Sequence, residues 1–179
     1  MGKIERPFYD RPYPSRNYVD LRPWQDDKTI LRNPHKGWYW HFIDNGYGRP
    51  AYRDQNVPGD YLTDFPGLNH LYLRFDWGDI EKTEGCYDWS YIDQIFEEWG
   101  AHDYRFSFRI CTYEGSNRGP TQYATPEWVF RAGAKYFEKE GRIEPDYGDP
   151  IYLEKLERFM AEYGRKFAND PRVEFIDIG

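Results

Sequence analysis

Hydrophobic positions along the chain predict short buried strands alternating with amphipathic helices. Apolar and aromatic residues are dense enough for strands at 37–42, 68–75, 105–111 and 173–178. In the segments that separate the last three of these strands, apolar residues recur every three or four positions. This is the period of a helix face packed on a core. Strand, helix, strand, helix, strand is typical of a parallel sheet built from right-handed crossover units.

The first predicted helix begins at Asp88 or Ser90, because either side chain can accept hydrogen bonds from the free amides of a first turn. Gly100 is expected to end it in the left-handed conformation that glycine adopts readily. The face that this helix presents to the core is predicted to consist of Trp89, Ile92, Ile95, Phe96 and Trp99.

Two further helices start at proline-containing signals. Thr125 is expected to cap a helix that has Pro126 in its first turn and runs to about Phe137. A polar loop is predicted over 138–147. Asp149 and the proline after it then begin a helix that ends before 169–171, with an apolar face of Ile151, Leu156, Phe159, Met160, Tyr163 and Phe167.

The start of the chain and the first turn narrow the fold class. Residues 7–28 are rich in Pro, Tyr, Arg and Asp without a regular period, so 1–32 is interpreted as an extended N-terminal arm. A doubly wound sheet would also fit the alternation of elements. It is disfavoured because Gly46 and Gly48 lead to Pro50 rather than to a helix, so the glycine-rich phosphate turn of such folds is missing.

Composition excludes several classes of partner. The net charge is -7 and the mean hydropathy is -0.97, with acidic and basic residues mixed along all 179 positions. Nucleic acid and anionic membranes are therefore not expected partners. No apolar run approaches the roughly 20 residues of a membrane span, and the first residues lack a signal-peptide core. The compartment stays open: cytoplasmic, or secreted if a signal precedes this sequence.

Aromatic residues and cysteines add two expectations. Aromatic residues make up 20% of the chain, and such rings can fill a core or line a groove for a polar, ring-shaped ligand. Cys86 and Cys111 are the two cysteines, and with no extracellular marker they are expected to be free thiols. The four histidines show no ligand spacing, so neither a metal nor another cofactor is expected.

Four motifs resemble the N-terminal half of a clan-A-type (β/α)8 glycoside hydrolase, similar to family-42-type β-galactosidases and related uncharacterised barrels. The most specific is Arg-Phe-Asp-Trp at 74–77 together with 80–93, where Lys82 replaces a proline usual in these families. The others are Asn-Pro-His-Lys-Gly-Trp at 33–38, Ala-Thr-Pro-Glu-Trp-Val at 124–129 and Val-Glu-Phe-Ile-Asp-Ile-Gly at 173–179.

This resemblance implies an α/β fold, the first four strand-helix units of a (β/α)8 TIM barrel over 33–179, truncated after strand four. A whole barrel typically needs about 250 residues. The resemblance further implies cleavage of an O-glycosidic bond in a β-linked sugar by a retaining, two-carboxylate mechanism. Both catalytic glutamates would lie beyond Gly179, so this chain alone is expected to be inactive. Its partners would be a carbohydrate substrate and the C-terminal half of the barrel.

Candidate site residues follow from the rule that strand ends on one face of a barrel form the active site. Arg74 resembles the family arginine that orients the nucleophilic carboxylate, and the alternative is a structural ion pair with Asp76 or Glu81. Packing or anchoring roles are the alternative for every other candidate. The predicted substrate-binding residues are Trp38, His41, Asp76, Trp77, Arg109, Thr112 and Trp128.

The carboxylates within the chain do not form a convincing catalytic pair. Asp76 and Glu114 could be combined, but Glu81 and Glu84 are interpreted as surface-loop residues and Asp177 as part of the last strand. The second hypothesis is accordingly a non-catalytic carbohydrate-binding or scaffold module. A Trp-Gly-Glu-like continuation beyond the chain would distinguish the enzyme from this alternative.

Overall fold

The computed structural model describes residues 21–29, 37–43, 61, 67–113, 123–139 and 141–177. The chain divides into two compact units, residues 1–31 and residues 32–179. In the first unit, a 3-10 helix η1 (Arg22–Trp24) precedes a turn in which the backbone amides of Lys28 and Thr29 donate to Asp26 Oδ1 over 2.9 Å. The rest of the predicted arm, 1–32, lies outside the described residues.

The second unit is built on a four-stranded parallel sheet. Its strands are β1 (Trp38–Ile43), β2 (Leu68–Asp76), β3 (Arg105–Cys111) and β6 (Val173–Asp177), and their order in the sheet is β1-β2-β3-β6. All four predicted strands are thus confirmed. Because spatial order follows chain order, each crossover brings the chain to the next position in the sheet.

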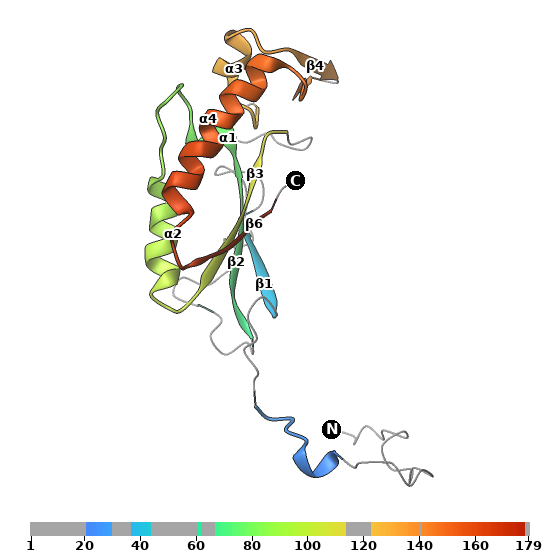
Figure 1. The fold of residues 1–179 in the computed structure, drawn as a ribbon, viewed down its shortest axis with the longest axis vertical. Coiled ribbons are helices and arrows are strands. Elements are labelled where there is room, and N and C mark those ends of the chain that lie inside the picture. Colours follow the sequence, from blue (N-terminus) through green and yellow to red (C-terminus); the bar gives the residue numbers. More distant parts are fainter. Residues whose placement is uncertain are drawn as a thin grey trace, which may run out of the picture. The chain divides into compact units, whose positions relative to one another are not determined.

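The two long helices, α2 (Ser90–Gly100) and α4 (Pro150–Phe167), lie on the same side of the sheet (Figure 1). Aromatic contacts join them to β3. The ring of Phe96 stacks 4.0 Å from that of Phe106, and the Phe167 ring lies 5.1 Å from that of Phe108. A doubly wound sheet would carry helices on both faces. The described part is therefore a mixed α/β fold with a singly wound parallel sheet.

The alternation of side chains along the strands divides the sheet into two unlike faces. On the face toward the helices, β2 contributes Leu71, Leu73 and Phe75, which pair in register with residues of β3. All belong to one buried core cluster. The opposite face carries polar residues at the intervening positions. In β3, the core-facing residues are Phe106, Phe108 and Ile110.

The segment between β3 and α4 differs from the sequence prediction. The predicted helix to Phe137 is wrong, because α3 (Glu127–Arg131) ends within five residues and Gly133 follows with a left-handed φ of +105°. The predicted polar loop is also wrong. Its place is taken by an antiparallel hairpin of β4 (Tyr136–Lys139) and β5 (Arg142–Pro145).

The predicted helix ends are confirmed in part. Asp149 Oδ1 accepts from the amides of Ile151 and Tyr152 at the start of α4, as expected. Gly100, by contrast, is not left-handed. The residue after α2 that has a positive φ is Asp103, at +68°. A side chain at position 100 would be crowded, because its Cβ would lie 3.3 Å from Arg172 Cδ.

Thr125 does not cap α3. Its hydroxyl instead donates to the carbonyl oxygen of Thr112 over 2.6 Å, which ties the loop after β3 to the start of α3. Both cysteines are free, as predicted, Cys86 exposed and Cys111 buried at the end of β3. A one-turn helix α1 (Trp77–Ile80), which the sequence did not predict, follows β2 directly.

Candidate functional site

The polar face of the sheet brings ionisable residues of neighbouring strands into register. Arg74 of β2 pairs with Arg109 of β3, two residues before the carboxyl ends of both strands. Tyr72 pairs with Ser107 two residues earlier along the strands. Like charges directly opposite each other in a sheet are unfavourable, so this arginine pair requires compensating carboxylates or a ligand.

Asp177, the last residue of β6, supplies one compensating charge. Tyr72 Oη donates to Asp177 Oδ2 over 2.5 Å, and Arg109 Nε lies 3.4 Å from the same oxygen. Three strands are thereby joined through one carboxylate. Because that oxygen accepts a hydrogen bond from Tyr72 and forms an ion pair with Arg109, the end of β6 is held against β2 and β3 by charge-assisted contacts.

Burial, together with the hydrogen bond to Asp177 and its negative charge, raises the pKa of Tyr72 to about 12. The guanidinium groups of Arg109 and Arg74 act in the opposite direction, which is expected if both lie near the phenol. Tyr72 is therefore a neutral hydrogen-bond donor over the physiological pH range.

A cavity of about 470 Å³ opens at the carboxyl ends of β2 and β3. Its size is within the roughly 300 to 1,000 Å³ typical of small-molecule sites. Guanidinium, thiol, hydroxyl and aromatic groups surround it, so it offers both hydrogen-bond donors and apolar ring surface. The lining residues are Arg74, Arg109, Cys111, Thr112, Tyr113 and Tyr147.

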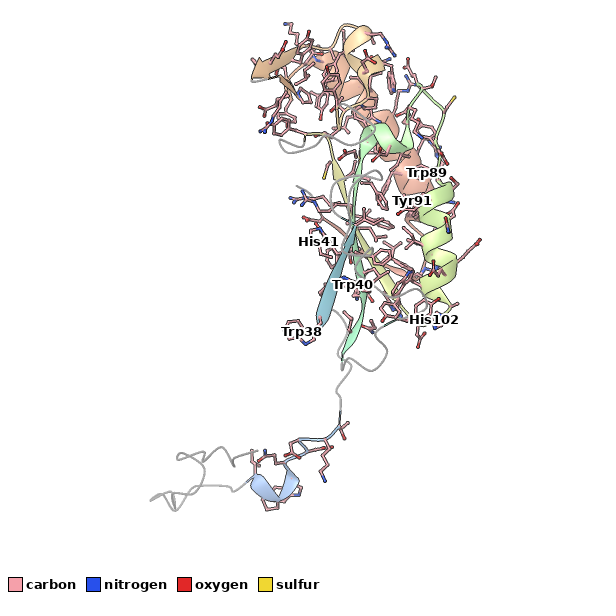
Figure 2. All side chains as sticks on the ribbon, turned by 180° about the vertical axis from the view of Figure 1, so that it is seen from behind. Trp38, Trp40, His41, Trp89, Tyr91 and His102 are labelled. Atoms are coloured by element: carbon pink, nitrogen blue, oxygen red, sulfur yellow. The ribbon has the colours of Figure 1, made fainter. Side chains whose placement is uncertain are left out.

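Several predicted site residues are brought together here. Arg74, Arg109 and Thr112 all line the cavity. Asp76 is fully buried at the carboxyl end of β2, in register with Cys111. His41 lies within β1 rather than at its end; its ring centroid is 5.3 Å from that of Tyr72, and Figure 2 shows it on the opposite side of β1 from Trp40.

The three tryptophans predicted to bind substrate lie elsewhere. Trp38 is 64% exposed but begins β1, at the amino end of the sheet, away from the strand ends that form the cavity (Figure 2). Trp77 is fully buried, with its indole N–H donating to Glu81 Oε2 over 2.7 Å. Trp128 is 9% exposed and donates to the Glu81 carbonyl oxygen. Their surroundings are those of core or strand-start residues.

The environment of Arg74 bears on the ion-pair alternative. Glu81 is only 2% exposed, so its interpretation as a surface-loop residue is wrong. Its carboxylate accepts hydrogen bonds from Trp77 Nε1 and from the amide of Gly85, both over 2.7 Å, and so stabilises the loop after α1. Arg74 Nη2 lies 3.9 Å from Cys111 Sγ. A pairing of Arg74 with Glu81 is thus not favoured by the contacts of Glu81.

Sequence reasoning missed Tyr72, Tyr113, Tyr147 and the site role of Asp177. The signal for Tyr72 was present, since every second residue from His70 to Asp76 is polar or amphipathic. Tyr147 comes from the turn after an unpredicted hairpin, so no strand pattern indicated it. Glu114, which could be combined with Asp76 as a carboxylate pair on the sequence alone, lies outside the described residues.

The described ranges contain neither a candidate metal-binding group nor a candidate membrane-spanning helix. Among these residues, no group of three or more His, Cys, Asp or Glu side chains is placed to hold a metal ion. No helix in the described part of the chain is long and apolar enough to cross a membrane.

The comparison with known proteins gives similarity of fold. The sequence matches no protein-family model and no curated protein. A β-galactosidase from the Antarctic haloarchaeon Halorubrum lacusprofundi is similar in structure, with a TM-score of 0.51 and 18% identity over 74% of this chain. A β-galactosidase from the psychrophilic Marinomonas ef1 aligns over 62% with a TM-score of 0.46 and 16% identity.

This chain spans only 20% and 17% of those two β-galactosidase chains. The first similarity shows that the described sheet and helices have a β-galactosidase-like arrangement. At such low identity it assigns no activity, and the residues of the site have to be argued from their own geometry.

Proposed function

We propose that this chain is part of a β-galactosidase-like glycoside hydrolase, in which it forms the first four strand-helix units of a (β/α)8 barrel. The observation that carries the proposal is the cavity at the carboxyl ends of β2 and β3, lined by Arg74 and Arg109. Active sites of barrels of this class lie at that end of the strands. The singly wound sheet and the β-galactosidase-like fold support the same conclusion.

Arg74 is proposed to orient a nucleophilic carboxylate contributed by a later strand. A guanidinium can hold a carboxylate in a bidentate geometry and favours its ionised form, which a nucleophile needs. His41, Asp76, Arg109 and Thr112 are proposed to contact the sugar or to support those contacts. The acid/base and nucleophile of a retaining mechanism, about 5 to 5.5 Å apart, would come from the remainder of the barrel.

The test uses the complete product of the gene, including any residues encoded beyond position 179. We expect it to hydrolyse a nitrophenyl β-galactoside or a related β-glycoside, with retained anomeric configuration detected by NMR. Arg74→Gln should lower kcat/KM by on the order of 100-fold or more, as for loss of one preorganised donor. Arg74→Lys should restore little, because lysine has no planar fork.

Arg105→Gln is the matched control. Arg105 lies on the same strand as Arg109, but it pairs with Glu174 near the amino end of the sheet and does not line the cavity. Its activity should stay near that of the wild type. No hydrolysis of any β-glycoside by the complete gene product would contradict the enzymatic proposal.

One observation favours carbohydrate binding without cleavage as a second candidate. Asp177, a carboxylate 3.4 Å from Arg109 Nε, is already engaged by Tyr72 and by Arg109 itself. This candidate would be favoured if the reading frame stops without encoding two further carboxylates and the protein nevertheless binds sugar measurably.

A further inference from the structure

We propose that Tyr113 and Tyr147 provide the aromatic lining of a subsite for a neutral pyranose ring, whose hydroxyls would contact Arg109 and Thr112. This inference rests on the proposed function and adds the residues that recognise the sugar. It replaces the role that the sequence suggested for Trp38, Trp77 and Trp128, which lie elsewhere.

Both tyrosines line the cavity while keeping accessible ring surface. Tyr113 is 37% exposed and Tyr147 48% exposed. An amphipathic ring at the wall of a polar cavity can cover the apolar face of a sugar while neighbouring groups bind its hydroxyls. This combination occurs at the strand ends where the proposed chemistry takes place.

Tyr147 is held in place by its surroundings. It lies in the turn between β5 and α4, where the Asp146 amide donates to the Lys135 carbonyl over 2.9 Å and the Gly148 amide donates to Asp146 Oδ1 over 3.0 Å. Its ring is also edge-on to that of Tyr152, with centroids 5.8 Å apart. An ordered ring loses little freedom when a ligand binds, which favours affinity.

The balance of charge favours a neutral sugar over an acidic one. Arg74 and Arg109 contribute two positive charges on the polar face. Asp177 lies 3.4 Å from Arg109, and Asp76 lies in register with the cavity residue Cys111. Among the described residues, these two guanidinium groups and two carboxyl groups leave little net charge to attract an anion. Guanidinium N–H groups nevertheless remain suitable donors to vicinal hydroxyls.

The experiment measures binding of methyl β-D-galactopyranoside and methyl β-D-glucopyranoside to the intact protein by saturation-transfer NMR and calorimetry. Tyr147→Ala and Tyr113→Ala should each weaken binding about 3- to 10-fold, the effect expected for one aromatic contact. Tyr147→Phe should bind nearly as well as the wild type, because the ring is retained. Methyl β-D-glucuronide should bind no more tightly than the neutral glycosides.

Tyr136→Ala is the matched control. Tyr136 is 47% exposed on β4 and its ring lies 5.3 Å from that of Phe130, outside the cavity. Its removal should leave sugar affinity unchanged. An equal loss in this control, no effect of either cavity variant, tighter binding of the glucuronide, or no binding of any glycoside would overturn the subsite.

The two proposals fail in different ways. Sugar binding that depends on Tyr147, in a complete gene product that hydrolyses nothing, would support the subsite and contradict the glycosidase. Hydrolysis that is insensitive to Tyr147→Ala in both kcat and KM would do the reverse.

Discussion

The two faces of the β2–β3 pair are built from adjacent residues, yet they differ in nearly every physical respect. Phe108, on the helix face, is fully buried among aromatic rings of α2 and α4. Arg109, the next residue, is partly exposed and faces Asp177. One face stabilises the fold by removing apolar area from water, whereas the other concentrates polar and charged groups, among them the ion pair of Arg109 with Asp177. Such a polar face is where function is to be expected.

The largest expected effect comes from damaging the helix face. Phe108→Ala should lower the free energy of unfolding by about 3 to 5 kcal/mol, because it leaves a cavity between β3 and both helices. Urea denaturation followed by circular dichroism measures this loss.

Ser107→Ala is the control on the opposite face. Ser107 is equally buried, but its Oγ has no hydrogen-bond partner among the described residues, so removing it should change stability by less than about 1 kcal/mol. Similar losses of unfolding free energy in Phe108→Ala and Ser107→Ala would contradict the proposal that the helix face stabilises the fold more than the polar face does.

A smaller effect is expected at the turn that leads into β6. Arg172 donates to Asp170 through Nε and Nη2, over 2.9 and 2.7 Å, and to the Phe96 carbonyl oxygen through Nη1. Arg172→Ala should cost about 1 to 2 kcal/mol, a range reduced for its exposure.

The stability lost in Arg172→Ala is expected to depend on pH. The hydrogen bonds from Arg172 hold the pKa of Asp170 below its ordinary value. The stability that this gives is present above the unfolded pKa, near 4, and is lost as the pH falls through the lower folded value. The difference in unfolding free energy between wild type and Arg172→Ala should therefore shrink below about pH 4. A constant difference down to pH 2 would exclude this ionic contribution.

The contribution of Tyr72, on the polar face, to stability is expected to change at alkaline pH. Because the folded pKa of Tyr72 is raised to about 12 from an ordinary value near 10, the protonated phenol is favoured in the native state. Its contribution is complete below pH 10 and is lost as the pH rises through 12.

Tyr72→Phe should lack this component and lose less stability between pH 10 and 12 than the wild type. Ultraviolet titration of tyrosinate absorbance in the two proteins provides the direct measurement. A Tyr72 that ionises at pH 10 in the native protein would show that neither burial nor the hydrogen bond to Asp177 holds its phenol protonated in solution.

The smallest effect on stability, with a separate effect on association, is expected at the edge of the sheet. Within the described residues β6 pairs only with β3, and Phe175 and Ile176 are each 39% exposed. An exposed apolar edge strand promotes pairing between chains. Phe175→Lys should reduce self-association of the 179-residue chain in sedimentation velocity. A wild-type chain that stays monomeric at every concentration would refute this expectation.

The structure also shows why some sequence predictions succeeded and others failed. The strands and the start of α4 were predictable, because buried apolar runs and the Asp149-Pro150 signal are local. The helix expected to reach Phe137 ended at Arg131, since Gly133 adopts a left-handed conformation and the following residues pair as a hairpin. That pairing is a contact between segments, which a local pattern does not encode.

For the site, the sequence by itself determined that polar residues lie at or near the carboxyl ends of predicted strands, as Arg74, Arg109 and Thr112 do. Only the tertiary structure decided which of them meet. Trp77 lies in the core, where its indole N–H donates to Glu81, whereas Tyr147 reaches the cavity from a turn held by hydrogen bonds at Asp146. An aromatic ring suits a core or a binding site equally well. Its role is therefore set by the neighbours that folding brings to it.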